Sequence, residues 1–282
     1  MRAARRAWRR LEPVHAMIYF VPEATERYAA LGLDAQTAYF ASRAAAFGRA
    51  SAEVVIATFY NFNPDVVRGA LPGAWEKTSP ERVLAGRAEA AAAALRRGGI
   101  DRLPGLAETV SLARRAAEAA GDHAQGRALF AAHAAQPWPD EPVLQLWWAQ
   151  TLLREFRGDG HIAVLTAEGV TPIEALVLHA ATGTLPKAFL TATRAWPAEQ
   201  WDATAERLRG RGLLDGESLT PEGEAFRQAI EDRTDELALP AYTALGEDGC
   251  ERLAELARPF GRAVVDGGLF NLAQPAPGVD PH

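Results

Sequence analysis

The N-terminal half of the chain gathers aromatic and polar side chains of the kinds that hold a small molecule. The candidate residues are His15, Tyr19, Phe20, Tyr39, Arg43, Phe59, Tyr60 and Asn61. His15 and Tyr19 are four residues apart, as are Tyr39 and Arg43, so each pair shares one face of a helix. Ligand pockets combine mainly apolar walls with a few directed hydrogen-bonding groups. The pattern predicts a pocket for a hydrophobic or aromatic small molecule.

An ordinary core is the alternative for the same residues. Tyrosines bury their rings while keeping their hydroxyl groups near water, which needs no ligand. Asn63 is predicted to cap the helix that follows it, which leaves Asn61 freer to contact a ligand.

The densest polar group of the second half forms a second set of candidate ligand-binding residues. These are Arg154, Arg157, Asp159 and His161, with His179 further along the chain. The alternative is structural: Asp159 caps a helix, Arg157 pairs with Asp159 or Glu155, and the histidines are ordinary interior or surface residues.

No motif with a spacing diagnostic of catalysis is present in the sequence. It has no Gly-rich phosphate loop, no H-E-x-x-H, no nucleophile elbow and no cluster of metal-ligand residues. A His–Asp or His–Tyr acid–base pair has no support beyond the residue types. We therefore expect no metal and no cofactor, and the sequence favours a binding protein over any particular reaction.

The amino-acid composition predicts a folded chain, and its net charge does not favour nonspecific binding to nucleic acid. Of 282 residues, 48% are apolar and 23% charged, which excludes a disordered chain. The net charge of −6 argues against broad binding to phosphates and leaves room only for a small basic face. A single cysteine, Cys250, no apolar run near the roughly 20 residues of a membrane span and no signal peptide predict a cytoplasmic protein without a membrane partner.

The elements that position these residues are predicted to be helices arranged in two units. Alanine, leucine and arginine dominate the chain, and three prolines in residues 136–142 exclude a continuous helix there. We therefore predict one aromatic-rich, degenerate winged-helix-like unit over residues 1–135, a second unit over residues 143–270, and a flexible tail over residues 271–282.

An internal repeat relates the two units. Four landmarks keep their order: His15 with His161, Ala38 with Ala175, Asn63-Pro64 with Trp196-Pro197, and Ser79-Pro80 with Thr220-Pro221. The last pair combines a Ser or Thr cap with a proline in the first helical turn. The repeat predicts that His15 and His161 face one another across a pseudo-twofold axis and share a central cavity.

The second unit has the sequence pattern of a winged helix. Helices are predicted over about residues 171–181, 185–194 and 197–210. Residues 212–219 follow as a hairpin, with short strands at Leu213-Leu214 and Leu219 and a type I′ turn at Asp215-Gly216.

This pattern resembles the MarR group of winged-helix regulators. Members commonly read R-G-L-hydrophobic, then L-T-x-x-G across the wing, and the chain shows Arg211-Gly212-Leu213-Leu214, then Leu219-Thr220-Pro221-Glu222-Gly223. It is also similar to actinobacterial helix-turn-helix proteins of unassigned role, through residues 13–20, 59–64 and 157–161. The MarR-like resemblance implies that the third helix enters the major groove and the wing touches the backbone, with DNA contacts from Lys187, Arg194, Arg207, Arg209 and Arg211.

Acidic residues on the same elements weaken the implied binding to DNA. Glu199, Asp202 and Glu206 lie on the third helix, and Asp215 and Glu217 lie at the tip of the wing. We expect a mainly α fold of two tandem winged-helix-like units, whose long helices form a pseudo-twofold single-chain dimer in a monomer. The expected function is a small-molecule-binding, single-chain MarR-like transcriptional regulator of double-stranded DNA. The alternative is a scaffold that has lost DNA binding and acts as a ligand-sequestering protein or an enzyme in specialised metabolism.

Overall fold

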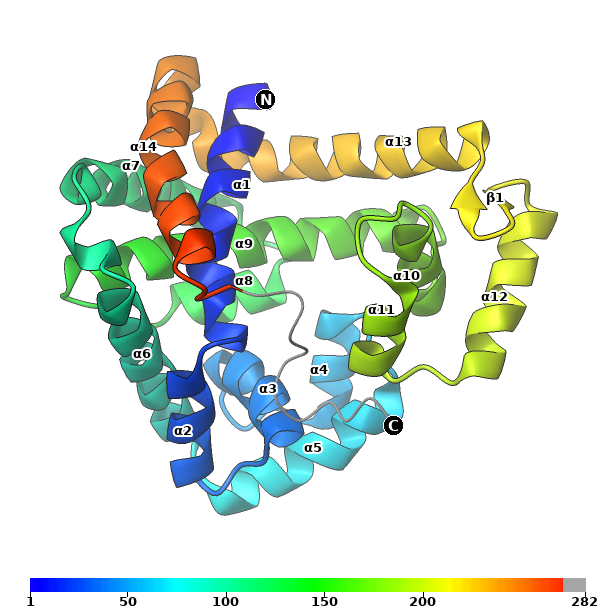
Figure 1. Ribbon diagram of the computed structural model, residues 1–282, viewed down its shortest axis with the longest axis horizontal. Coiled ribbons are helices and arrows are strands. Elements are labelled where there is room, and N and C mark those ends of the chain that lie inside the picture. Colours follow the sequence, from blue (N-terminus) through cyan, green and yellow to red (C-terminus); the bar gives the residue numbers. More distant parts are fainter. Residues whose placement is uncertain (271–282) are drawn as a thin grey trace.

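The computed structural model describes residues 1–270, and the regular structure of this part is almost entirely helical (Figure 1). The N-terminal helices are α1 (Arg2–Ala16), α2 (Pro22–Ala30), α3 (Ala35–Ala44), α4 (Ala52–Phe59), α5 (Pro64–Lys77), α6 (Pro80–Arg97), α7 (Leu106–Ala119) and α8 (Ala128–Ala134). Short 3-10 helices join them: η1 (Met17–Tyr19), η2 (Ala45–Phe47), η3 (Ile100–Arg102) and η4 (Ala120–His123). The prediction of a mainly α protein is confirmed. The predicted tail lies outside the described residues.

The second half begins with a helix of 26 residues and carries the two strands of the described chain. Its elements are α9 (Pro142–Ala167), α10 (Pro172–Ala180), α11 (Lys187–Arg194), α12 (Ala198–Gly210), β1 (Leu214–Asp215), β2 (Ser218–Leu219), α13 (Pro221–Ala238), η5 (Leu239–Leu245) and α14 (Gly246–Asp266). Within residues 1–270, no single helix has the length and apolar composition to span a membrane; α9 and α10, bent by 104° at their break, pass that test only as a pair.

Helix starts follow the caps that the sequence predicts. The hydroxyl oxygen of Ser79 accepts a hydrogen bond from the Arg82 N–H at the start of α6, and Thr220 accepts one from the Gly223 N–H at the start of α13. Each cap satisfies a backbone donor that has no partner inside the helix. Gly223 is also required sterically, because a Cβ there would collide with the carbonyl oxygen of Leu213.

Two hydrophobic cores divide the structure, and α9 passes from one to the other. The larger core is built from residues 3–156 together with η5, α14 and Leu269, while the smaller core spans residues 164–230. In Figure 1, α1 and α14 pack side by side, and α9 and α13 run together toward the lobe formed by α10, α11 and α12. The cores therefore separate within α9 and not at the predicted boundary in residues 136–142, because this long helix contributes side chains to both.

The lobe contains a helix-turn-helix followed by a hairpin. Helix α11 ends at Arg194, the next residue, Ala195, adopts the left-handed conformation, and α12 begins after Pro197. Leu214 pairs with Leu219 and Asp215 with Ser218 in antiparallel register. The predicted hairpin is therefore present, but its loop is Gly216-Glu217. The predicted type I′ turn is wrong, because that turn needs positive φ at both central residues and only Gly216 has it.

Replacing Ala195 with glycine is expected to raise the free energy of unfolding by about 0.5 to 1 kcal/mol. The left-handed conformation costs an alanine about 1 to 2 kcal/mol, and the extra freedom of glycine in the unfolded chain offsets part of that gain. The matched control is Ala203→Gly in the exposed middle of α12, which should lose about 1 kcal/mol. Urea denaturation measures both; a loss at residue 195 would contradict the expectation.

Candidate functional site

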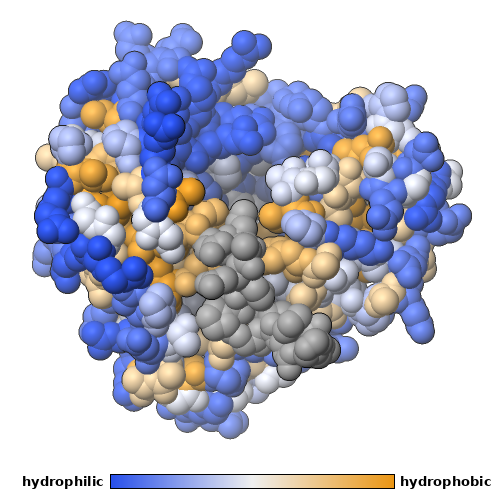
Figure 2. Space-filling view, in the orientation of Figure 1, coloured by the Kyte–Doolittle hydropathy of each residue, from blue (hydrophilic) through white to orange (hydrophobic). Residues whose placement is uncertain are grey.

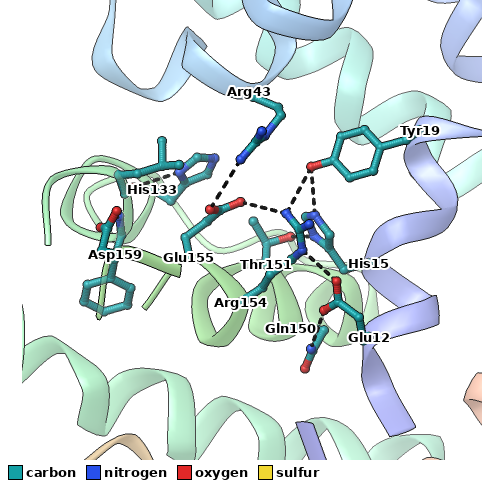
Figure 3. Close-up of polar contacts among 12 residues, drawn as sticks. Glu12, His15, Tyr19, Arg43, His133, Gln150, Thr151, Arg154, Glu155 and Asp159 are labelled. Carbon is teal, nitrogen blue, oxygen red and sulfur yellow. Dashed lines mark hydrogen bonds and ion pairs between the residues drawn. The ribbon is translucent and has the colours of Figure 1, made fainter. Parts of the chain in front are cut away.

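A buried polar network joins α1 and η1 to α3, α6 and α9. We define it by eight residues, most of which appear in Figure 3: Glu12, His15, Tyr19, Arg43, Arg87, Thr151, Arg154 and Glu155. His15 is fully buried, and its Nδ1 lies 2.8 Å from the hydroxyl oxygen of Thr151. That hydroxyl donates to the Trp147 carbonyl, so it accepts the proton of His15 Nδ1. The lone pair of the ring is therefore on Nε2.

The Tyr19 hydroxyl completes this arrangement. It donates to Nε2 of His15 at 3.1 Å and accepts from Arg87 at 3.3 Å and from Arg154 at 3.4 Å. Burial, followed by the charges of nearby arginines, lowers the pKa of His15 well below 6.5, so the ring is neutral at neutral pH. The Tyr19 proton thus lies between its oxygen and a neutral imidazole, with two cations facing the oxygen. This geometry can hold an anionic or hydrogen-bonding ligand, or move a proton.

Glu155 is the buried anion of the network. Its carboxylate lies 3.4 Å from Arg154 and 4.0 Å from Arg43, and the side chain is only 6% exposed. Burial alone would raise the pKa of this carboxyl, but Arg154 and Arg43 bring it below 4.5. Arg154 also binds Glu12 at 2.7 Å. The carboxylates therefore hold two of the guanidinium groups in fixed positions.

The aromatic residues of α3 and α4 extend the network toward the helix-turn-helix lobe. Tyr39 accepts a hydrogen bond from Arg43 at 3.2 Å, and the Arg43 guanidinium lies 4.1 Å from the centre of the Phe59 ring. Burial would raise the pKa of Tyr39, but the surrounding guanidinium groups lower it below 10. Arg194, the last residue of α11, lies over the ring of Phe62, which packs on Tyr39. The network and these aromatic residues thus contain four arginines and only two carboxylates. They are Arg43, Arg87, Arg154 and Arg194, with Glu12 and Glu155.

Several candidate residues connect the two halves and do not line the network. Tyr60 donates its hydroxyl to the Val170 carbonyl, and the Asn61 carbonyl accepts from the indole N–H of Trp196 at 2.9 Å. Asn63 caps α5 as predicted, and its amide also donates to the Ala195 carbonyl at 2.8 Å. The turn before α5 is therefore bonded to the turn before α12. Phe20 packs edge-on against Phe270.

The expected meeting of His15 and His161 is wrong. His15 bonds to Thr151, whereas Nδ1 of His161 bonds to Thr234 on α13 at 2.9 Å. Thr151 and His161 are ten residues apart on α9, which separates them by about 15 Å along the helix axis. His179 lies on α10 in the lobe, partly buried, where burial lowers its pKa. The two repeat-related histidines therefore do not share a central cavity.

Arg157 and Asp159 have structural roles: Arg157 has partners other than the predicted ones, whereas Asp159 does cap a helix, but a distant one. Arg157 pairs with Asp235 and Glu231 of α13, and not with Asp159 or Glu155. Asp159 lies inside α9, and its carboxylate accepts the Phe130 N–H at 2.9 Å, so it caps α8 across the fold. Burial raises the pKa of Asp159 to about 6.

The basic residues implied for DNA contact are mostly neutralised on the lobe surface. Lys187 lies 3.4 Å from Glu217 and 3.7 Å from Asp202, Arg209 lies 2.6 Å from Glu206, and Arg211 lies 3.2 Å from Glu174. Arg207 is exposed and bonds only to Thr204 among residues 1–270. The guanidinium of Arg194 packs on Phe62 and so is turned inward, away from the lobe surface on which the other basic candidates lie. Figure 2 shows mainly hydrophilic residues along the outer edge of the lobe.

Sequence reasoning missed Glu12, Arg87, Thr151, Glu155 and His133 as members of the site or its surroundings. One signal could have found two of them: Thr151 and Glu155 follow Trp147 on α9 at intervals of four residues, on one buried face that the predicted Asp159 continues. A polar stripe on such a face requires buried partners. No group of three or more His, Cys, Asp or Glu side chains within residues 1–270 is arranged to hold a metal ion.

The structure is that of a helical protein with a helix-turn-helix and a two-stranded hairpin in its second half. A model described as a helix-turn-helix family matches residues 4–271. The chain belongs to that helix-turn-helix family, which at a coarse level indicates a DNA-binding regulator. Comparisons with curated proteins and with solved structures found no match.

Proposed function

We propose that the chain is a single-chain, MarR-like transcriptional regulator whose affinity for DNA responds to a small molecule. The observation that carries this proposal is the sequence of α11, turn, α12 and hairpin, with α12 preceded by the turn and followed at once by the wing. In proteins of this architecture the second helix of the motif enters the major groove. Its residues Arg207, Gln200 and Glu199 are exposed and available to bases or phosphates.

The order of the elements supports a tandem arrangement of two related units. Helices α3, α4, α5 and α6 follow one another as α10, α11, α12 and α13 do. The two non-glycine residues with positive φ in residues 1–270, Tyr60 and Ala195, end α4 and α11 and so occupy the same place in the two series. Each unit also contributes a helix to the other, since α1 packs on α14 and α9 packs on α7. Packing of this kind between the two halves supports a single-chain pseudo-dimer.

The path from ligand to DNA would run through Arg194. Tyr19, Tyr39 and Arg43 are partly buried and offer an aromatic and polar surface to a hydrophobic or aromatic effector. Arg194 joins that surface to the last turn of α11, and the hydrogen bonds from Asn63 and Trp196 tie the two turns together. A ligand that prefers one position of the lobe shifts its population only by its difference in affinity between the positions.

DNA binding tests the proposal directly. Fluorescence anisotropy with mixed genomic fragments, first in low salt and then near physiological salt, should show sequence-selective binding. Arg207→Ala should weaken it and lower the slope of log K against log salt by about one, the value for one lost phosphate contact. Arg102→Ala is the matched control, because Arg102 is exposed on η3, outside the lobe. Equal binding by both variants would contradict the proposed use of α12.

A second candidate function is a scaffold that has lost DNA binding and sequesters a ligand or catalyses a reaction. Two observations favour it: acidic residues pair with Lys187, Arg209 and Arg211, and the Tyr19 proton faces the neutral His15 ring. Absence of DNA binding even in low salt would support this second candidate and refute the regulator.

A further inference from the structure

The turn that precedes α5 and the turn that precedes α12 lie against each other. The Asn63 N–H donates to the Arg194 carbonyl at 3.0 Å, and the side-chain amide of Asn63 donates to the Ala195 carbonyl at 2.8 Å. The indole N–H of Trp196 donates to the Asn61 carbonyl at 2.9 Å. Three hydrogen bonds therefore hold the two turns together.

Side chains of residues 60 and 62 continue the same contact. Tyr60 donates its hydroxyl group to the Val170 carbonyl, and its ring packs on the smaller core. The Arg194 guanidinium lies 4.4 Å from the centre of the Phe62 ring, and Phe62 is buried. Figure 1 shows the start of α5 beside the turn that leads into α12. Moving the lobe away from α5 would break these hydrogen bonds and expose these rings to water.

The bonded turns fix the spacing of the two helices that correspond in the proposed tandem arrangement, α5 and α12. Dimeric helix-turn-helix regulators place their two recognition helices one turn of the duplex apart, about 34 to 36 Å. Helix α5 begins at the residue after Asn63, and α12 begins three residues after Ala195, a reach of about 11 Å at most. Helices α5 and α12 therefore cannot enter successive major grooves while the turns stay bonded.

Helix α5 also lacks two features that suit α12 to DNA. Both of its basic residues are paired, since Arg68 lies 2.9 Å from Glu53 and Lys77 lies 3.7 Å from Asp34. Arg207 on α12, by contrast, is exposed and forms no ion pair within residues 1–270. A hairpin follows α12, whereas α6 begins two residues after the end of α5, and β1 and β2 are the only strands among the described residues. The first unit therefore has neither a free cation on this helix nor a wing.

We propose that the chain reads DNA as a single half-site, with α12 in one major groove, the hairpin on the flanking backbone, and α5 outside the groove. This mode of reading rests on the proposed binding to DNA, and it specifies the target as one short asymmetric element instead of an inverted repeat. The first unit supports the lobe through the bonded turns and is not a second reader.

Selection from duplexes with about 30 randomised base pairs tests this mode of reading, because that length has room for two half-sites about 10 base pairs apart. We expect enrichment of one asymmetric element, with one chain bound per element when native mass spectrometry counts the chains on the selected duplex. An enriched inverted repeat bound by one chain would overturn the single half-site and leave the proposed DNA binding standing. No enriched sequence, even in low salt, would refute both.

Arg68 and Arg207 provide a matched pair of variants, because they are exposed arginines on the corresponding helices α5 and α12. With the selected duplex, Arg207→Ala should lower the slope of log K against log salt by about one. Arg68→Ala should leave the slope and the affinity unchanged, because Arg68 stays paired with Glu53 and away from the duplex. Fluorescence anisotropy at several salt concentrations measures both. An equal loss in the two variants would place α5 on DNA and overturn the single half-site.

Discussion

Glu155→Ala is expected to lower the free energy of unfolding by about 3 to 5 kcal/mol, the usual cost of removing one partner of a buried ion pair. Its carboxylate lies between Arg154 and Arg43, and the side chain is only 6% exposed. The substitution leaves more cations than anions among Arg43, Arg87, Arg154 and Glu12, in a region where water does not screen their repulsion. Urea denaturation followed by circular dichroism measures the change.

Glu251→Ala provides the matched control for this prediction. Glu251 also pairs with an arginine, Arg6, but both side chains are nearly half exposed. An exposed pair contributes about 0 to 1 kcal/mol, so the control should remain close to the unmodified protein. Similar losses in the two variants would mean that burial does not govern the network, and the assignment of Glu155 as its buried anion would fail.

Sequence signals predicted the helix boundaries because the forces that start a helix act over a few residues. A capping residue followed by a proline is enough to predict where a helix begins, as in Ser79-Pro80 and Thr220-Pro221. The structure confirms both helix starts. The hairpin was predicted for the same local reason. Its turn was misplaced by one residue because Gly216 fits either two-residue loop, and the pairing of Leu214 with Leu219 decides between them.

Within the site, only neighbours one helical turn apart could be predicted. His15 bonds to Tyr19 and Arg43 bonds to Tyr39, as their spacing of four residues indicated. The partners that complete the network come from distant parts of the chain: Thr151 is 136 residues from His15. The packing of α1 on α9 brings them together, and no local pattern encodes which residues of two helices meet.

The orientation of a side chain at a contact between distant parts of the chain also could not be predicted from the sequence. The MarR-like resemblance implied a DNA contact for Arg194, the last residue of α11, yet its guanidinium packs on Phe62. That orientation depends on the bonds between the two turns, which involve Asn63, Ala195 and Trp196. Position within a motif thus does not decide the role of a residue when another part of the chain covers that face.

We expect the titrations of His133 and Asp159 to have opposite effects on the free energy of unfolding, so that the two effects largely cancel as the pH changes. Burial lowers the pKa of His133 from 6.5 to about 4, so the unfolded chain binds more protons in that window and acidification destabilises the fold. Burial raises the pKa of Asp159 from 3.8 to about 6, so the folded chain binds more protons and acidification stabilises it. Each effect amounts to about 3 kcal/mol across its window, at about 1.4 kcal/mol per pH unit.

Single substitutions should separate the two opposite dependences of the free energy of unfolding on pH. Between about pH 6 and about pH 4, His133→Gln should become more stable relative to the unmodified protein as pH falls, because only the contribution of Asp159 remains. Asp159→Asn should become less stable over the same range, because only His133 titrates, and the amide oxygen of the substituted side chain can still accept the Phe130 N–H as the carboxylate does. Other ionisable groups near the pair, namely Glu155, Arg43, Arg87 and Arg127, are common to all three proteins and cancel in the comparison. Urea denaturation at several pH values measures the slopes, and parallel profiles for the two variants would show that neither group titrates with a shifted pKa.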